Sequence, residues 1–129
     1  MTIHTIMTAD ESGKELVEMA KQVAQTLVNN RLTRNQIRNI FTETRQIEAM
    51  WQMGGDHKSD ALRRLNMLKP KLAYQTARTS SVEDLKKALS EAIDEVEKAP
   101  AEKKDAAFTR FMNFFEAILA YHHALGGRN

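Results

Sequence analysis

Hydrophobic residues recur every three or four positions along almost the whole of this 129-residue chain. That spacing places them on one side of an α-helix, whereas the strict alternation of a half-buried β-strand is missing. Only five glycines and two prolines interrupt the pattern. Because 42% of the residues are hydrophobic, the chain can bury a real core, and its length suits one domain. The sequence therefore predicts an all-α fold, a compact single-domain bundle over residues 1–129.

Capping and turn residues divide the pattern into about five helices. The first is expected over roughly Ser12–Asn30, and residues 1–9 ahead of it are expected to form a loose N-terminal arm. The second begins where Thr33 and Gln36 form a capping box, in which each side chain can bond a backbone N–H of the first turn. The glycine pair at residues 54–55 ends it.

The third helix, roughly Ser59–Ala77, contains a proline. Because Pro70 removes one backbone N–H and crowds the carbonyl four residues earlier, we expect this helix to be kinked or broken near Pro70. The fourth helix is expected to open at Ser81, with Asp84 completing an acidic variant of the capping box, and to run to about Lys98.

The last helix begins at Ala101 and carries an aromatic-rich face. His122 continues that face, so we expect a packed or interface histidine there and not a metal ligand. Trp51 continues an apolar face and is expected in the core, with an interface anchor at the helix end as the alternative. Met67 is expected to fill the core. Tyr74 could stack on a nucleic-acid base, but we expect it to cap the core with its hydroxyl outward.

No catalytic constellation is visible in the sequence. The absence of cysteine excludes disulfides, thiolate zinc sites and cysteine nucleophiles. The Glu-x-x-His pattern of di-metal bundles, His-Glu-x-x-His and the phosphate-cradling Gly-x-x-x-x-Gly-Lys are also missing. The sequence therefore predicts no enzyme activity, no metal site and no cofactor.

The first residues, MTIHTIM, contain neither a basic segment nor an apolar run of the length that a signal peptide or a membrane span needs. We therefore expect a soluble, cytoplasmic protein with no membrane partner.

The charges are unevenly distributed along the chain. Residues 31–78 contain ten basic and four acidic residues, whereas the segments on either side each carry a small acidic excess. The net charge of +2 for the whole chain hides this segregation. A local positive field on a small domain points to a polyanion, most often nucleic acid, although solvated charges on a helix surface would give the same count.

The arginines of the second helix fall on one side of it. At 100° per residue, Arg34, Arg38 and Arg45 lie within about 40° of one another, beside the apolar face and not on it. Arg31 falls near the same stripe, at about 60° from Arg34, if the helix reaches back to it.

The third helix repeats this arrangement. Arg64, Lys71 and Arg78 are seven residues apart, which keeps them within about 40° on a straight helix, although a kink at Pro70 would rotate the lower half. If the two helices are neighbours, their stripes form one basic ridge. Such a ridge would contact phosphates without reading the base sequence.

Three segments together resemble one known family. They are LTRNQIRNIF at residues 32–41, LKPKLAY at residues 68–74 with Arg78 shortly after, and FFEAILAYH at residues 114–122. In this order and spacing they are similar to the small subunit of the type III-A CRISPR effector, the Csm interference complex. The LKPKLAY segment is the most specific of the three.

The resemblance implies a non-catalytic helical protein of a prokaryotic ribonucleoprotein. Copies of this subunit stack along the inner groove of the complex, beside the backbone subunits that hold the CRISPR RNA, and help to hold the guide–target RNA duplex. Cleavage and cyclic oligoadenylate synthesis belong to other subunits, among them a large polymerase-like one. The implied partners are CRISPR RNA, target RNA, these other subunits and neighbouring copies.

The resemblance also marks residues that face RNA in the family. Carried over by motif, it selects Arg34, Arg38, Lys69, Lys71 and Arg78. The helical-face argument adds Arg31, Arg45 and Arg64. A rival hypothesis makes the same ridge a protein-interaction surface that scaffolds sister subunits without touching RNA. An enzyme is a second rival, which the lack of a polar triad or metal set disfavours.

Overall fold

The computed structural model describes residues 2–128, and within them it contains six α-helices, two short 3₁₀ helices and no β-strand. The elements in order are α1 (Ile3–Thr8), α2 (Lys14–Asn29), α3 (Arg34–Gln52), α4 (His57–Arg78), η1 (Ser80–Val82), α5 (Glu83–Lys98), η2 (Ala101–Lys103) and α6 (Lys104–Ala124). The predicted all-α class is confirmed.

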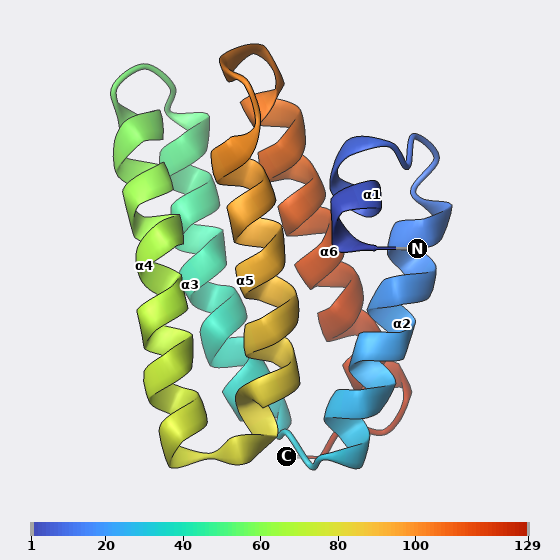
Figure 1. Ribbon diagram of the computed structural model, residues 1–129. Coiled ribbons are helices and arrows are strands. Elements are labelled where there is room, and N and C mark those ends of the chain that lie inside the picture. The colour runs from blue at the N-terminus through green and yellow to red at the C-terminus, as the bar shows by residue number, and fades with distance from the viewer. Residues whose placement is uncertain (1, 129) are drawn as a thin grey trace.

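Four of the helices form a closed bundle. Helix α3 packs on α4, α4 on α5, α5 on α6, and α6 returns to α3, with successive helices running in opposite directions (Figure 1). Helix α2 lies along α6 and also touches α5, while the short α1 lies against α5 and α6. As a result, α3 is flanked by α4 on one side and by α6 on the other.

The expected loose arm at residues 1–9 is wrong, because Ile3–Thr8 form helix α1. The Thr2 hydroxyl caps this helix by accepting a hydrogen bond from the Thr5 N–H at 3.1 Å. Ile6 is fully buried, and His4 Nδ1 lies 2.6 Å from a carboxylate oxygen of Glu95 in α5. A helix of six residues is too short for its periodicity to stand out in the sequence, and the count of about five helices is therefore one short.

The predicted kink or break near Pro70 is not confirmed, because α4 runs as one continuous helix from His57 to Arg78. Pro70 lies on the exposed side, where water can bond the carbonyl that loses its N–H partner. On the opposite side, Leu68 and Leu72 are buried and hold both halves of the helix against the bundle.

Two predicted caps have different outcomes. At the start of α3, the Gln36 N–H donates to Thr33 Oγ1 at 3.1 Å and the Thr33 N–H donates to Gln36 Oε1 at 2.8 Å, so the capping box is confirmed. The cap predicted at Ser81 is wrong. The chain there forms the 3₁₀ turn η1, and α5 begins at Glu83 without a side-chain cap. Burial of Val82 in the core favours this tight turn.

Aromatic residues of α6 fill the centre of the bundle, as the sequence predicts. Phe111, Phe114 and Phe115 are completely buried. Trp51 is also buried, and its ring stacks on Phe108 with centroids 4.5 Å apart. This packing fixes α3 against α6 and thereby sets the position of the arginines on α3. None of the helices within residues 2–128 has the length and apolar character that crossing a membrane requires.

Candidate nucleic-acid interface

The eight basic residues selected from the sequence fall into two classes according to their contacts. Within residues 2–128, four form ion pairs with carboxylates and four do not. The paired residues are Arg45, Arg64, Lys69 and Lys71. The unpaired residues are Arg31, Arg34, Arg38 and Arg78, and together they are called the basic end.

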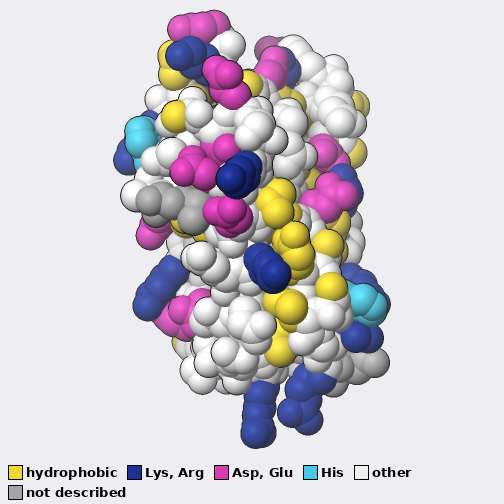
Figure 2. All heavy atoms as spheres, turned by 90° about the vertical axis from the view of Figure 1, so that its right-hand side faces the viewer, with side chains coloured by type: hydrophobic (Ala, Val, Ile, Leu, Met, Phe, Trp, Pro, Cys, Tyr) yellow, Lys and Arg dark blue, Asp and Glu magenta, His cyan; other side chains and the backbone are white. Residues whose placement is uncertain are grey.

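The four residues of the basic end come from two separate parts of the chain that reach the same end of the bundle. Arg31 lies between α2 and α3, Arg34 and Arg38 lie in the first two turns of α3, and Arg78 is the last residue of α4. Both parts lie at the lower end of the bundle in Figure 1, with Arg34 and Arg38 on the flank of α3 that faces α6 and Arg78 on the side of α4. Figure 2 shows Lys and Arg side chains extending from the same end of the molecule.

Local backbone geometry directs Arg31 outward. Its φ is 66°, in the left-handed region that non-glycine residues seldom adopt, and its N–H donates to the Val28 carbonyl at 3.0 Å. The next residue, Leu32, is completely buried, and its N–H bonds the Leu27 carbonyl at 3.0 Å. Burial of Leu32 therefore fixes the turn, and the exposed Arg31 side chain projects from it.

The acids at this end of the bundle are engaged elsewhere. Glu83 lies 3.4 Å from the Lys86 ammonium and 3.7 Å from the Lys87 ammonium, while Asp84 accepts a hydrogen bond from the Asn30 amide at 2.8 Å. They reduce the local field, but they do not contact the arginines of the basic end.

The chain adds polar groups around the basic end that sequence reasoning missed. Gln36 and Asn39 of α3 and Gln75 of α4 line a hollow together with Arg78. These amides are hydrogen-bonding groups suited to phosphate or ribose oxygens. These residues are far apart in the sequence, so their proximity could be predicted only by knowing that α3 packs against α4.

A second hollow runs between α3 and α6. Arg34, Arg38 and Arg45 line one side and Glu116 and His123 the other, around a volume of about 500 Å³. Within residues 2–128, the Arg34 Nε is buried without a hydrogen-bond partner. The stripe of three arginines predicted on α3 therefore exists, and it faces α6.

Arg45 differs from the other two residues of that stripe. Its guanidinium lies 2.8 Å from Glu48, 3.7 Å from Glu116 and 4.9 Å from the centre of the Phe41 ring. Two carboxylates thus already compete for its charge.

Arg64 and Lys71 of α4 converge on Glu43 of α3. The Lys71 ammonium donates to Glu43 at 2.7 Å, and the Arg64 guanidinium donates to the same carboxylate and to Gln46 at 3.2 Å. The hydrogen bond from Lys71 and, after it, the contact with Arg64 hold the pKa of Glu43 below its ordinary value, against an opposing effect of burial. One carboxylate therefore offsets part of the charge of two predicted RNA contacts.

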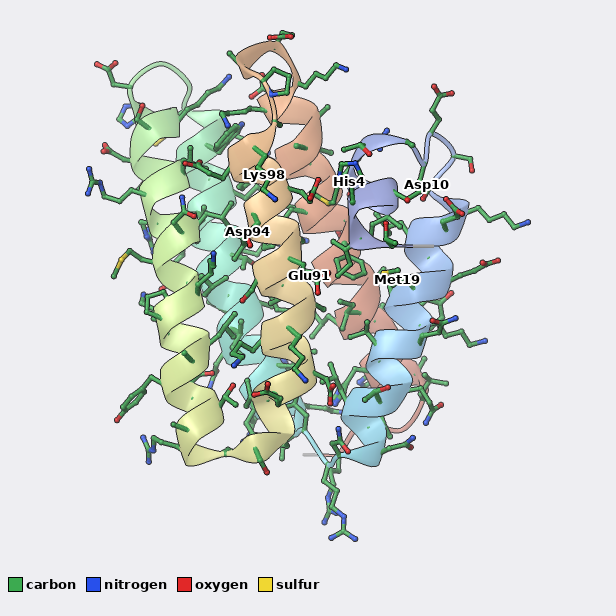
Figure 3. All side chains as sticks on the ribbon, viewed as in Figure 1. His4, Asp10, Met19, Glu91, Asp94 and Lys98 are labelled. Atoms are coloured by element: carbon green, nitrogen blue, oxygen red, sulfur yellow. The ribbon has the colours of Figure 1, made fainter. Side chains whose placement is uncertain are left out.

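Lys69 faces a different neighbour from Lys71. Its ammonium lies 2.5 Å from Asp94, on the side of α5 that faces α4 (Figure 3). The two lysines around Pro70 thus point to opposite flanks of α4, one toward α5 and one toward α3.

The single basic ridge expected from the sequence is not formed. Glu43 lies about 180° around the helix from Arg34, so the α3 arginines face α6 while Glu43 and its two partners face α4. The sequence contains the signal for this separation, because Glu43 could have been placed on the same helical wheel as the arginines. What the wheel alone could not show is which flank meets α4.

His122 is the packed histidine that the sequence predicts. It is completely buried, and its Nε2 lies 2.7 Å from the Leu32 carbonyl, which can only accept a hydrogen bond. Gly127 lies against its ring, where a larger residue would collide with the His122 carbonyl as well. Beside it, the Arg34 N–H bonds the Arg128 carbonyl at 2.6 Å, so the C-terminal segment closes on the start of α3.

Among residues 2–128, no three His, Asp or Glu side chains come together in a way that could hold a metal ion.

The fold and the basic end define a small all-helical protein with several arginines at one end of its bundle that are unpaired within residues 2–128. The model of the family described as Csm2 Type III-A matches residues 10–128, and the chain belongs to this family. It is accordingly a structural small subunit of the type III-A CRISPR complex, and the other subunits of the Csm complex are its partners. Comparisons with curated proteins and with solved structures gave no match.

Proposed function

We propose that this subunit binds the RNA backbone inside the Csm complex through its basic end, without catalysing a reaction, and helps to hold the guide–target RNA duplex. The observation that carries the proposal is the gathering of Arg31, Arg34, Arg38 and Arg78 at one end of the bundle without carboxylate partners in residues 2–128. The RNA partners are CRISPR RNA and target RNA, and the site of action is the prokaryotic cytoplasm.

An unpaired guanidinium is better suited to this role than a paired one. It releases only water and counterions when a phosphate arrives, and its fork geometry matches two phosphate oxygens. The paired residues must first leave a carboxylate, as Lys71 must leave Glu43 at 2.7 Å. The basic end therefore supplies the primary contacts, and Arg45, Arg64, Lys69 and Lys71 supply weaker ones.

Contacts of this kind are independent of base sequence and sensitive to salt. One free copy should bind weakly, because four arginines neutralise few phosphates. Neighbouring copies in the complex would then add avidity.

The test compares Arg38→Ala with Lys71→Ala in RNA binding over a range of salt concentrations. Each loss should weaken binding uniformly across RNA sequences and reduce the slope of log K against log salt by about one. The effect should be larger for Arg38, since Lys71 must leave Glu43 before it can meet a phosphate and so contributes less to binding. Lys103→Ala, an exposed cation in η2 at the opposite end of the bundle, is the control. Unchanged binding in both test variants would remove the proposal.

The rival hypothesis of a purely protein-binding surface makes a different prediction for the assembled complex. Crosslinking the purified complex should give RNA adducts within residues 31–78. Adducts to protein subunits alone in that segment would favour the rival.

A further inference from the structure

Tyr74 does not cap the core as the sequence suggested. Its side chain is 64% exposed on the outer side of α4. Met67, expected to fill the core, is 53% exposed on the same side, and Pro70 lies exposed between them. The spacing of three and four residues places all three on one surface of the helix. Core packing therefore does not explain why large apolar and aromatic side chains occupy these positions.

The surroundings of this surface are cationic. Met67, Pro70, Lys71, Tyr74, Gln75 and Arg78 line a shallow hollow of about 410 Å³. The Arg78 guanidinium carbon lies 5.9 Å from the centre of the Tyr74 ring, within the range of a cation–π contact. The lining contains two cations and no acid, although one of them, Lys71, also contacts Glu43 at 2.7 Å outside the hollow. An occupant must therefore combine a flat apolar part with negative charge beside it.

A nucleotide has this combination. Its base can stack on an aromatic ring, and its phosphate can meet a neighbouring cation. The hollow also adjoins the basic end, because Arg78 belongs to both. Charge complementarity thus favours RNA over a protein partner, whose contact surface would have to be acidic.

We infer that Tyr74, with Met67 and Pro70 beside it, is a stacking platform for an unpaired base of the RNA, whose phosphates meet Arg78 and Lys71. This inference rests on the proposed function and adds to it the class of RNA that the site takes. A base inside a continuous duplex has no free face, so the platform requires a single-stranded, bulged or extruded nucleotide.

The experiment uses the full chain and two RNA duplexes that differ by a single bulged nucleotide. The bulged base is 2-aminopurine, whose fluorescence falls on stacking. Tyr74→Ala should lower the affinity for the bulged duplex roughly fivefold or more and abolish the fluorescence change. It should leave affinity for the continuous duplex within twofold of wild type. Tyr74→Phe should behave as wild type, and Met53→Ala, which truncates a residue 66% exposed beyond the far end of α3, is the matched control.

The outcomes separate this inference from the proposal on which it rests. If Tyr74→Ala changes neither duplex while Arg38→Ala weakens both, the platform is wrong and the backbone contact stands. Equal losses on both duplexes would also overturn the platform, as would loss of a sister-subunit contact with RNA affinity unchanged. If the wild-type chain binds neither duplex at low salt, both proposals fail. Because Tyr74 is exposed, its substitution should not change the temperature at which the protein unfolds. Thermal unfolding of each variant checks this.

Discussion

At the scale of single residues, Glu43 determines how much of the predicted positive charge is available. It is 22% exposed and contacts both Arg64 and Lys71. Surface ion pairs of this kind contribute about 0–1 kcal/mol to stability, so a phosphate can compete for the same cations. The electrostatic consequence of Glu43 for a polyanion is therefore larger than its consequence for the fold.

Replacing this carboxylate tests that view. Glu43→Gln keeps the shape of the side chain and releases Arg64 and Lys71 from the ion pairs. RNA affinity should rise a few-fold at low salt, and the salt slope should steepen by about one to two. Binding titrations at several salt concentrations measure both quantities. Glu102→Gln, which removes an exposed carboxylate of η2 away from the proposed RNA contacts, is the comparison. If Glu43→Gln leaves affinity unchanged, this seam does not contact RNA.

The pH dependence of stability reports the same carboxylate. The pKa of Glu43 is lowered in the folded protein, first by the hydrogen bond from Lys71, so the folded state binds a proton less readily than the unfolded state. The stabilisation is therefore complete above the ordinary value of 4.5 and is lost as the pH falls through the lower folded pKa.

Urea unfolding at pH 7 and pH 3 should show this loss. At pH 7, Glu43→Gln should be less stable than wild type by about 1 kcal/mol or less. At pH 3 the difference should be smaller, because Glu43 is then largely protonated in the unfolded chain and its lowered pKa in the folded state contributes less stabilisation. Asp105 also has a lowered pKa, caused first by Lys58 and then by the Trp51 indole N–H, and it is unchanged in both proteins. A difference that grows at pH 3 would contradict this account of Glu43.

At the scale of helices, the docking of α1 gives a test of the corrected N-terminal region. Ile6 is completely buried between α1 and the bundle. Ile6→Ala should therefore destabilise the protein by about 2–4 kcal/mol, for lost burial and the cavity left behind. Val17→Ala, at a position 42% exposed on α2, should cost much less. Chemical denaturation of both variants decides the matter, and equal small effects would show that α1 does not contribute to the folded core.

The helices also show how far sequence reasoning reaches. Long amphipathic segments and the Thr33 capping box were predictable because each depends on residues three or four apart. The failures at Ile3–Thr8, Pro70 and Ser81 have a different origin, since tertiary packing decides all three. Ile6 and Val82 are buried by residues far away in the sequence, which local patterns do not reveal. Pro70 is tolerated because it faces water.

The candidate site also has a part that local sequence patterns predict and a part that tertiary packing decides. The positions of Arg34, Arg38 and Arg45 on one flank of α3 followed from the helical period alone. Their separation from Arg64 and Lys71 did not, because it depends on α3 lying between α4 and α6.

At the scale of the whole molecule, an experiment can separate the effect of where the positive charge lies from the effect of the total charge on RNA binding. A net charge of +2 spread over the surface would attract RNA only weakly, whereas unpaired cations at one end of the molecule attract it in one orientation. Two double variants remove the same charge from different places. Arg31→Gln with Arg78→Gln neutralises half of the basic end, and Lys21→Gln with Lys103→Gln neutralises two exposed cations outside it.

At 0.1 M salt the first double variant should lose affinity for RNA about tenfold or more, and it should reduce the salt slope by about two. The second should change affinity by less than threefold, because a Debye length of about 10 Å at 0.1 M salt limits the reach of charges outside the basic end. Fluorescence anisotropy with one RNA duplex measures both proteins side by side. Equal losses would mean that RNA responds to the total charge of the molecule, and an orientation imposed by the basic end would then have no support.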